Sequence, residues 1–143
     1  MNKLLEITSI LVDCYSKIVE PVCEKYSITK AEFDIVMFLA NNPCFDTATD
    51  VVVKRHIAKS YVSMSVKSLE KKGYIERFYL NNNRRTIHLR LKNSADNIIK
   101  DGRAAQKSFY ELMFKGIADE DMDKLGRIVE RMQLNMEKFK EEV

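Results

Sequence analysis

The sequence has few residues that interrupt helices. It contains four glycines and two prolines among 143 residues, while 45% of the residues are apolar and 31% are charged. This balance is typical of a soluble protein built mainly from helices, and it argues against disorder. A chain of this length also matches the usual size of one domain with one sizeable core, so we expect a single domain covering residues 1–143.

Long apolar runs and cysteine pairs are missing as well. No apolar run approaches the roughly 18–20 residues that span a bilayer, and Glu6 and Asp13 interrupt the N-terminal stretch where a secretion signal needs an apolar centre. We therefore expect a cytoplasmic protein with no membrane partner. Cys14, Cys23 and Cys44 form no CxxC pair and leave one cysteine over in any disulfide scheme, which fits free thiols in a reducing compartment.

Patterns that carry catalysis are also missing. The chain has two histidines, His56 and His88, and it shows no Ser/Cys–His–acid pattern, no glycine-rich phosphate loop and no metal-ligand spacing. We interpret both histidines as surface residues. The sequence therefore predicts a protein that is not an enzyme and that holds neither a cofactor nor a metal ion.

Positive charge is concentrated in one segment. Between Lys54 and Lys92 there are eleven basic residues and two acidic ones, Glu70 and Glu76, a net charge of +9. The rest of the chain carries 13 basic and 19 acidic residues, a net charge of −6. A basic segment inside an acidic frame is typical of a surface that binds a polyanion such as nucleic acid. A solvated surface with a chance run of basic residues is the alternative that counting leaves open.

Helical spacing dominates both ends of the chain. Apolar residues recur at steps of three and four in one N-terminal stripe: Leu4, Ile7, Leu11, Tyr15, Ile18, Val22 and Tyr26. Pro21 is expected to bend this helix near its end. We predict two C-terminal helices, from about Ser94 to Lys115 and from about Asp119 to Glu141. The first has Ile98, Phe109, Leu112 and Met113 as expected core, and the second has a stripe of Met122, Leu125, Val129, Met132, Met136 and Phe139.

Two capping patterns mark shorter helices between these ends. Thr29 and Glu32 begin one helix, which Asn41-Asn42-Pro43 ends, and Thr47 and Asp50 begin the next. A turn near His56 then leads into a further helix that Gly73 ends. Four residues of this further helix share one face and are expected to point inward: Val62, Ser65, Val66 and Leu69.

The opposite face of that helix is short, polar and cationic. It presents Ser60, Ser63, Met64 and Lys67, with Tyr61 and Lys71 at the edges. Such a face fits a DNA major groove about 12 Å wide, where Ser bonds base edges or phosphates and Lys reaches guanine or phosphate. Two short helices joined by a tight turn, the second with an exposed polar face, predict a helix-turn-helix. A plain solvent-facing helix surface is the alternative.

A β-hairpin is predicted after this helix. Residues 75–80 and 86–91 each alternate with a period of two, and Asn81-Asn82-Asn83 between them tolerates the left-handed backbone of a turn. A two-stranded ribbon after a recognition helix is the wing of a winged helix. We expect its tip to carry Arg84 and Arg85 beyond the body of the protein, where a guanidinium group enters a narrow DNA minor groove.

These residues resemble the MarR family of bacterial transcription regulators. The family's threonine-capped second helix, its LE-x-x-G-x-I and ER segments and its wing closed by Asp-x-Arg match residues 28–43, 69–75, 76–77 and 83–85 in order and spacing. The resemblance covers essentially the whole chain.

The resemblance implies a mainly α fold with a small β wing. A winged helix-turn-helix over residues 28–92 is expected to bind DNA, and residues 1–27 and 94–143 are expected to form the helical dimerisation region. The implied function is that of a homodimeric repressor of transcription that binds a pseudo-palindromic operator in double-stranded DNA. The residues expected at the DNA are Lys59, Ser60, Tyr61, Ser63, Met64, Lys67, Arg84 and Arg85.

Other roles stay open beside this function. A small-molecule effector, bound between the dimer helices and the winged domain, is a candidate partner that releases the operator. A winged helix that serves as a protein–protein adaptor is one alternative, although it has no evident need for Arg84 and Arg85. A regulator that senses redox state through cysteine is another, but the family's reactive cysteine falls on Leu5 here. We therefore expect Cys14 and Cys23 to be buried structural thiols.

One wing residue departs from the family pattern. Asn83 stands where the family has an aspartate that helps to hold the neighbouring arginine. The wing is therefore expected to be looser or differently ordered.

Overall fold

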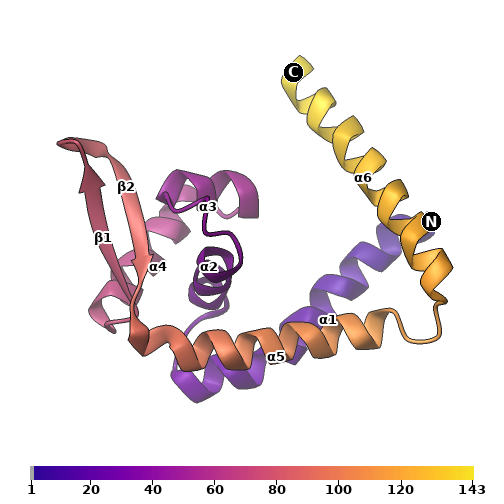
Figure 1. Cartoon of the computed structure of the whole chain (residues 1–143), viewed down its shortest axis with the longest axis horizontal. Helices are drawn as coiled ribbons and strands as arrows, with labels where there is room; N and C mark the ends of the chain where they lie inside the picture. Colours follow the sequence, from indigo (N-terminus) through magenta and orange to yellow (C-terminus); the bar gives the residue numbers. More distant parts are fainter. Residues whose placement is uncertain (1) are drawn as a thin grey trace. The chain divides into compact units, whose positions relative to one another are not determined.

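The computed structural model of the protein describes residues 2–143, which form six α-helices, one short 3-10 helix and one two-stranded antiparallel sheet (Figure 1). The elements in chain order are α1 (Lys3–Tyr26), α2 (Lys30–Asn41), α3 (Ala48–Arg55), α4 (Lys59–Lys71), β1 (Ile75–Leu80), β2 (Asn83–Leu91), η1 (Asn93–Ala95), α5 (Asp96–Met113) and α6 (Asp119–Glu142). The predicted fold class, mainly α with a small β wing, is confirmed. The chain divides into two compact units, one extending to Phe109 and the other covering Tyr110–Val143.

Helix α2 forms the centre of the first unit. Every residue from Glu32 to Leu39 is buried, because α2 packs against α1, α3, α4 and β2 on different sides. A helix that is apolar nearly all round must be covered nearly all round, and α2 satisfies this requirement. The largest fully buried side chains come from α2 itself and from α4, β1 and α5: Phe33, Ile35, Met37, Leu69, Ile75 and Ile98.

Gly102 of α5 packs directly against side chains of α2. A Cβ atom added at this buried glycine would lie 2.4 Å from the Met37 Sδ atom and 3.0 Å from Phe33 Cε2. Only a residue without a side chain therefore fits this contact as it stands. Farther from the core, Asp101 of α5 accepts hydrogen bonds from Lys25 and Tyr26 of α1, at 2.8 Å and 2.7 Å.

Both capping patterns begin helices, but the first works differently from the expectation. Thr29 Oγ1 accepts a hydrogen bond from the Glu32 amide, as predicted, whereas the buried Glu32 carboxylate pairs with Lys72 Nζ at 3.0 Å. At α3 the capping box is complete, because the Thr47 and Asp50 side chains each bond the other residue's backbone amide. Pro21 lies inside α1, which continues to Tyr26.

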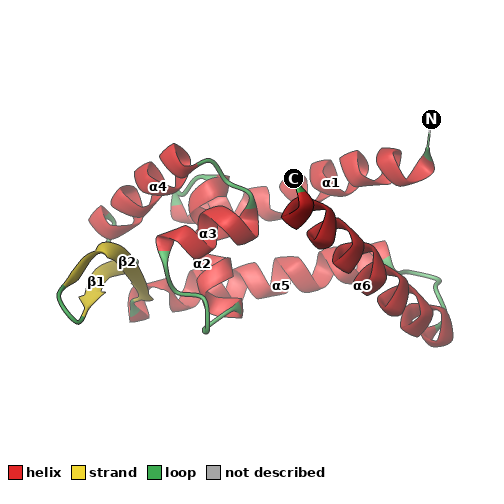
Figure 2. Cartoon of the chain, turned by 90° about the horizontal axis from the view of Figure 1, so that it is seen from above, coloured by secondary structure: helices red, strands yellow, loops and turns green. Residues whose placement is uncertain are grey.

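The hairpin turn is shorter than the three asparagines suggest. Asn81 and Asn82 adopt the left-handed conformation, with φ of 50° and 58°, and Asn83 already belongs to β2 and pairs with Leu80. The strands run in register from Ile75–Leu91 to Phe78–His88, and an irregularity then separates this ladder from the tip. Figure 2 shows the hairpin beside α4, to which β1 is packed.

The second unit consists of the end of α5 and the whole of α6. No residue of α6 is buried, and the later part of its apolar stripe is exposed: Val129, Met132, Met136 and Phe139. Leu112 was expected in the core, and this prediction is wrong, since 62% of the residue is exposed. Ile98, expected there too, is fully buried.

The apolar length of the helices and the exposure of the cysteines and of His56 bear on three predictions made from the sequence. Within residues 2–143, none of the helices is both long enough and apolar enough to cross a membrane. Cys23 is buried as expected, and burial raises the pKa of its thiol, while Cys14 is only partly buried and Cys44 is exposed. His56 is exposed at the end of α3, where its φ of 53° lets the chain turn toward α4.

Candidate nucleic-acid interface

Helix α4 has the two faces that its sequence predicts. Val62, Ser65, Val66 and Leu69 are buried against the core. All the α4 side chains expected at the DNA are exposed: Lys59, Ser60, Tyr61, Ser63, Met64 and Lys67. Ala58 offers no side-chain cap, so the backbone N–H groups of the first turn of α4 are free to meet an anion, which the helix dipole favours.

The Asn83 side chain holds the backbone at the start of β2. Asn83 Oδ1 accepts a hydrogen bond from the Arg85 amide at 3.0 Å, and Asn83 Nδ2 donates one to Thr86 Oγ1 at 3.2 Å. These two bonds order the first residues of β2, and the expected difference from the family wing stays a prediction.

Both wing arginines are exposed and lie within three residues of the hairpin turn, and their position against DNA stays a prediction. The apex of the hairpin is Asn81-Asn82, and both arginines belong to the return strand β2. The Arg84 guanidinium lies 5.0 Å from the centre of the Tyr79 ring. Arg85 lines a cavity of about 380 Å³ between α3, α4 and the wing, and Lys59 and Ser63 of α4 line the same cavity.

Most basic residues of the segment Lys54–Lys92 have no acidic partner. Four of the eleven are ion-paired, and both acidic residues of the segment are used in these pairs: Arg55–Asp34, Lys72–Glu32, Arg77–Glu70 and Arg90–Glu76. Within the described chain the other seven have no ion pair: Lys54, Lys59, Lys67, Lys71, Arg84, Arg85 and Lys92. Five of these seven belong to α4 and the wing, so the uncompensated charge gathers on the predicted DNA-binding elements.

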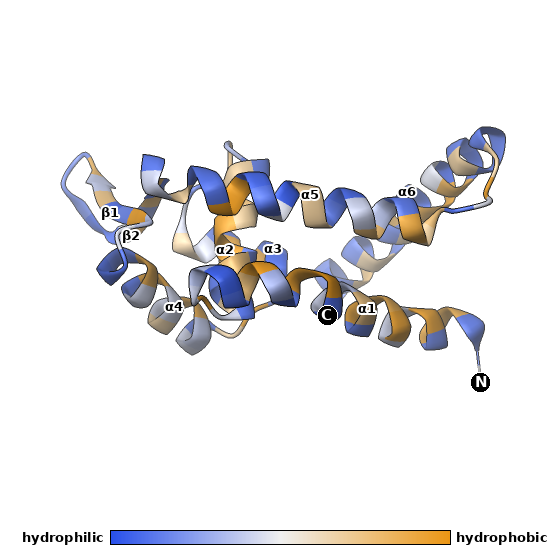
Figure 3. Ribbon diagram, turned by 90° about the horizontal axis from the view of Figure 1, so that it is seen from below, coloured by the Kyte–Doolittle hydropathy of each residue, from blue (hydrophilic) through white to orange (hydrophobic). Residues whose placement is uncertain are grey.

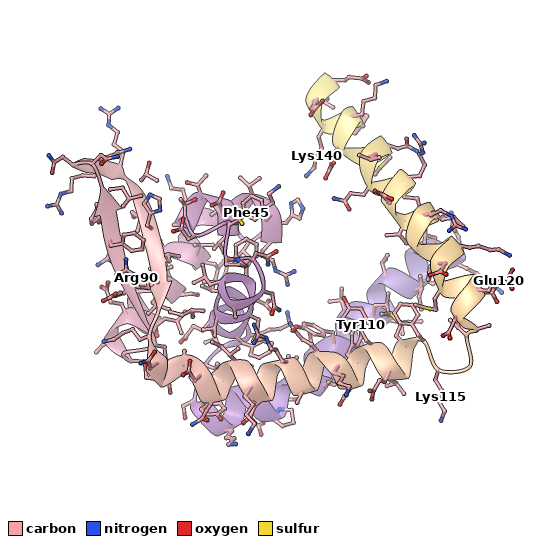
Figure 4. The ribbon with its side chains drawn as sticks, viewed as in Figure 1. Phe45, Arg90, Tyr110, Lys115, Glu120 and Lys140 are labelled. Carbon is pink, nitrogen blue, oxygen red and sulfur yellow. The ribbon has the colours of Figure 1, made fainter. Side chains whose placement is uncertain are left out.

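Two of the ion pairs hold the wing together and join it to α4. Arg77 of β1 donates from Nε and Nη2 to the two Glu70 carboxylate oxygens, at 3.0 Å and 2.9 Å, and this contact lowers the pKa of Glu70. Arg90 of β2, labelled in Figure 4, pairs with Glu76 at 2.9 Å and lies over the Phe78 ring at 4.2 Å. Helix α4 and the first wing strand are therefore tied by a two-point contact.

A third contact, which the sequence did not reveal, fastens the wing to the chain before α3. His88 Nδ1 lies 3.0 Å from Asp46 Oδ1, and the Leu89 amide donates to the Asp46 carbonyl at 2.7 Å. Thr47 also forms an isolated bridge with His88. The interpretation of His88 as a surface residue is wrong, because its side chain is only 15% exposed. Its partner lies 42 residues away, and neither residue carries a local signal of the contact.

No group of three or more His, Cys, Asp or Glu side chains within residues 2–143 is placed to hold a metal ion.

Comparison with known proteins connects this geometry to one family. Residues 26–78, which run from the end of α1 into β1, match the sequence model of the MarR family. No curated protein matches the sequence.

Solved structures with the same fold cover nearly the whole chain. The crystal structure of MarR is similar with a TM-score of 0.80 and 17% identity, over 98% of this chain and 95% of that one. A MarR transcriptional regulator from Methanosarcina mazei Go1 is similar with a TM-score of 0.82 and 18% identity, over 97% and 99%. BpsR from Bordetella bronchiseptica, whose DNA binding is regulated by 6-hydroxynicotinic acid, has a TM-score of 0.72 and 13% identity, over 92% and 99%. At these identities the likeness shows the fold.

Proposed function

The chain is a MarR-family winged helix protein by its sequence over residues 26–78 and by its fold, and from this premise we propose that it is a homodimeric, sequence-specific regulator that binds operator DNA and represses transcription. The main support for this proposal is the excess of unpaired positive charge. Seven basic residues of the segment Lys54–Lys92 have no ion pair in the described chain, and five of them lie on α4 and the wing. Such charge is costly to gather unless it meets phosphate, whose contacts supply much of the affinity for DNA.

The proposed DNA contacts divide between two grooves. The outer face of α4 enters the major groove, because it is exposed, polar and cationic along its length. The wing lies over the neighbouring minor groove, where Arg84 and Arg85 meet its negative potential. Arg85 starts from the cavity between α3, α4 and the wing, so it lies beside the recognition helix before DNA binds.

The homodimer is supported by apolar surface that the single chain leaves uncovered. Along the first half of α1, Leu4, Leu5, Ile7 and Ile10 are exposed, and along α6 a separate apolar row is exposed (Figure 3). Contiguous exposed apolar rows mark sites of association. A symmetric dimer also presents two copies of α4 to a pseudo-palindromic operator. We assign the dimerisation region to residues 1–27 and 94–143 and the DNA-binding region to residues 28–92.

A small-molecule effector that releases the operator is the remaining part of this proposal. It is supported by the similarity to BpsR, whose DNA binding is regulated by 6-hydroxynicotinic acid.

A mobility-shift titration tests the proposed function. The full-length protein is titrated against the DNA upstream of its own gene, with random-sequence duplex as competitor. We expect a complex that survives a large excess of competitor. Equal affinity for the upstream DNA and the competitor would contradict sequence-specific regulation, and no binding to either would favour a protein–protein adaptor.

The wing is tested by Arg85→Ala on operators with A·T-rich and G·C-rich flanks. We expect weaker binding that depends on the flanks, because a narrow A·T-rich groove concentrates negative potential. Ser60→Ala is the control, since its effect should not depend on the flanks. If Arg85→Ala and the unchanged protein bind all flanks equally, the wing does not read the minor groove.

A further inference from the structure

Two large side chains on the outer face of α4 are exposed although they are largely apolar. Tyr61 is 58% exposed and Met64 is 61% exposed, in the middle of a cationic surface that also carries Lys59 and Lys67. Neither fills the core, which α4 reaches through its opposite face. Apolar groups at these positions make no favourable contact with phosphates. An apolar group of the DNA is therefore the contact that would suit them.

Among the side chains that read bases by two hydrogen bonds, the outer face of α4 carries only lysine. Between Lys59 and Lys71 there is no Arg, Asn, Gln or Asp, and the single Glu, Glu70, is bound to Arg77. Arg and Lys suit guanine, and Asn and Gln suit adenine. On this helix only the lysines, the serines and the Tyr61 hydroxyl remain for hydrogen bonds. The polar side chains of α4 therefore supply few of the contacts that distinguish one base pair from another.

One base offers an apolar contact in the major groove, namely thymine through its C5-methyl group. Tyr61 and Met64 lie three residues apart, or about 4.5 Å along the helix axis, and both belong to the first two turns of α4. The N-terminal residues of a recognition helix are the ones that contact base edges. Building on the proposed function, we infer that Tyr61 and Met64 contact thymine methyl groups, so that α4 selects T·A pairs mainly by apolar contact.

The expected size of this effect follows from the chemistry of one methyl group. Removing a buried methyl group from an apolar contact weakens binding about four-fold. Replacing thymine with uracil removes only this methyl and leaves every hydrogen-bonding group of the base in place. The loss should therefore appear with uracil in the half-site and should disappear when the contacting side chain is removed.

The experiment begins with the full-length protein and a pool of random-sequence DNA duplexes. Bound sequences are selected, and each thymine of the enriched half-site is replaced singly with uracil. We expect at least one thymine in each half-site at which uracil weakens binding about four-fold. The same titrations are then made with Met64→Ala and Tyr61→Ala, which alter exposed side chains, and with Ser63→Ala as a control on the same face. Each apolar variant should lose the uracil effect at one position, while Ser63→Ala should keep it.

The outcomes separate this inference from the function on which it rests. If no sequence is enriched, the protein is not a sequence-specific DNA-binding protein, and both ideas fail at the first step. If a motif is enriched but every uracil duplex binds like its thymine parent, the proposed function stands and the methyl contact is overturned. A uracil effect that persists unchanged in both apolar variants would likewise overturn the roles of Tyr61 and Met64. Met64→Leu, which keeps an apolar side chain, should retain the uracil effect.

Discussion

Helices α4 and α6 have similar amphipathic sequences but reach different states in the single chain. The apolar face of α4 is buried by α2, α3 and β1, whereas no residue of α6 is buried. Hydrophobic spacing predicts that a helix has an apolar face, and it does so equally for both. It does not say whether the same chain or another molecule covers that face.

The apolar faces of α4 and α6 also contribute differently to the stability of the protein. The face of α4 contributes to the folding of its own chain, because it closes over a core that contains Phe33, Ile35 and Val36. The row on α6 contributes little until it is covered. Under the proposed function, a second copy of the chain covers it, so part of the total stability depends on protein concentration.

The largest expected effect comes from removing α6. Deleting the residues from Asp119 onward should abolish dimerisation and operator binding, because the exposed apolar row is lost with them. Sedimentation velocity and mobility shift measure the two losses. Met136→Glu should give the same result in a full-length chain, and Glu130→Ala should not. If the unchanged protein sediments as a stable monomer, the role given to α6 is wrong.

Two glycine substitutions sharpen the comparison between the core and α6. Gly102→Ala should lower the free energy of unfolding by about 1–3 kcal/mol, because the new Cβ atom would overlap Met37 in a packed core. Gly126→Ala should raise it by about 0.5–1 kcal/mol, because alanine favours the helix and nothing lies within 4 Å of the new atom. Urea denaturation measures both.

The opposite results would be equally informative. Stabilisation by Gly102→Ala would show that the Met37 side chain moves aside at little cost. Destabilisation by Gly126→Ala would show that another molecule lies against that part of α6.

Lys67→Ala should affect DNA binding and leave the fold unchanged. The side chain is exposed on α4 and has no ion pair within residues 2–143, so the free energy of unfolding should change by less than about 0.5 kcal/mol. If Lys67 meets a phosphate, affinity should fall about ten-fold on all sequences and the salt dependence should decrease by about one unit of slope. Lys138→Ala on α6 is the matched control. Unchanged affinity for operator and random DNA would remove Lys67 from the interface.

The smallest effect is expected at the contact between α4 and β1. Arg77 lowers the pKa of Glu70, so the pair stabilises the fold at neutral pH and loses this contribution as the pH falls through the lowered pKa. Glu70→Gln should therefore be less stable than the unchanged protein at about pH 7, by less than about 1 kcal/mol for so exposed a pair. Urea denaturation from about pH 7 to about pH 2 should show the difference disappearing. A difference that grows toward acid would contradict the assignment.

Much of the helix-turn-helix could be predicted because its signals are local. The capping box of Thr47 and Asp50 and the inward set from Val62 to Leu69 each lie within a few residues, and helical geometry alone brings them together. The short turn at Asn81 and Asn82 follows from their tolerance of the left-handed backbone in the same way.

Contacts between distant residues could not be predicted on these grounds. The pairing of Asp46 with His88 and the packing of Gly102 on Met37 join residues that no helical or strand period relates. The cavity that Arg85 lines is likewise formed by α3, α4 and the wing together, and no local pattern relates these elements.

Local chemistry was therefore enough to establish the order of the helices, the exposed face of α4 and the excess of positive charge around it. Those properties depend on which residues are neighbours along the chain. Tertiary packing determined which four basic residues of the segment Lys54–Lys92 are ion-paired. Two of them, Arg55 and Lys72, pair with Asp34 and Glu32, which lie outside this segment. Ion pairs form only between groups within a few ångströms, and folding alone brings together groups that are far apart in the sequence.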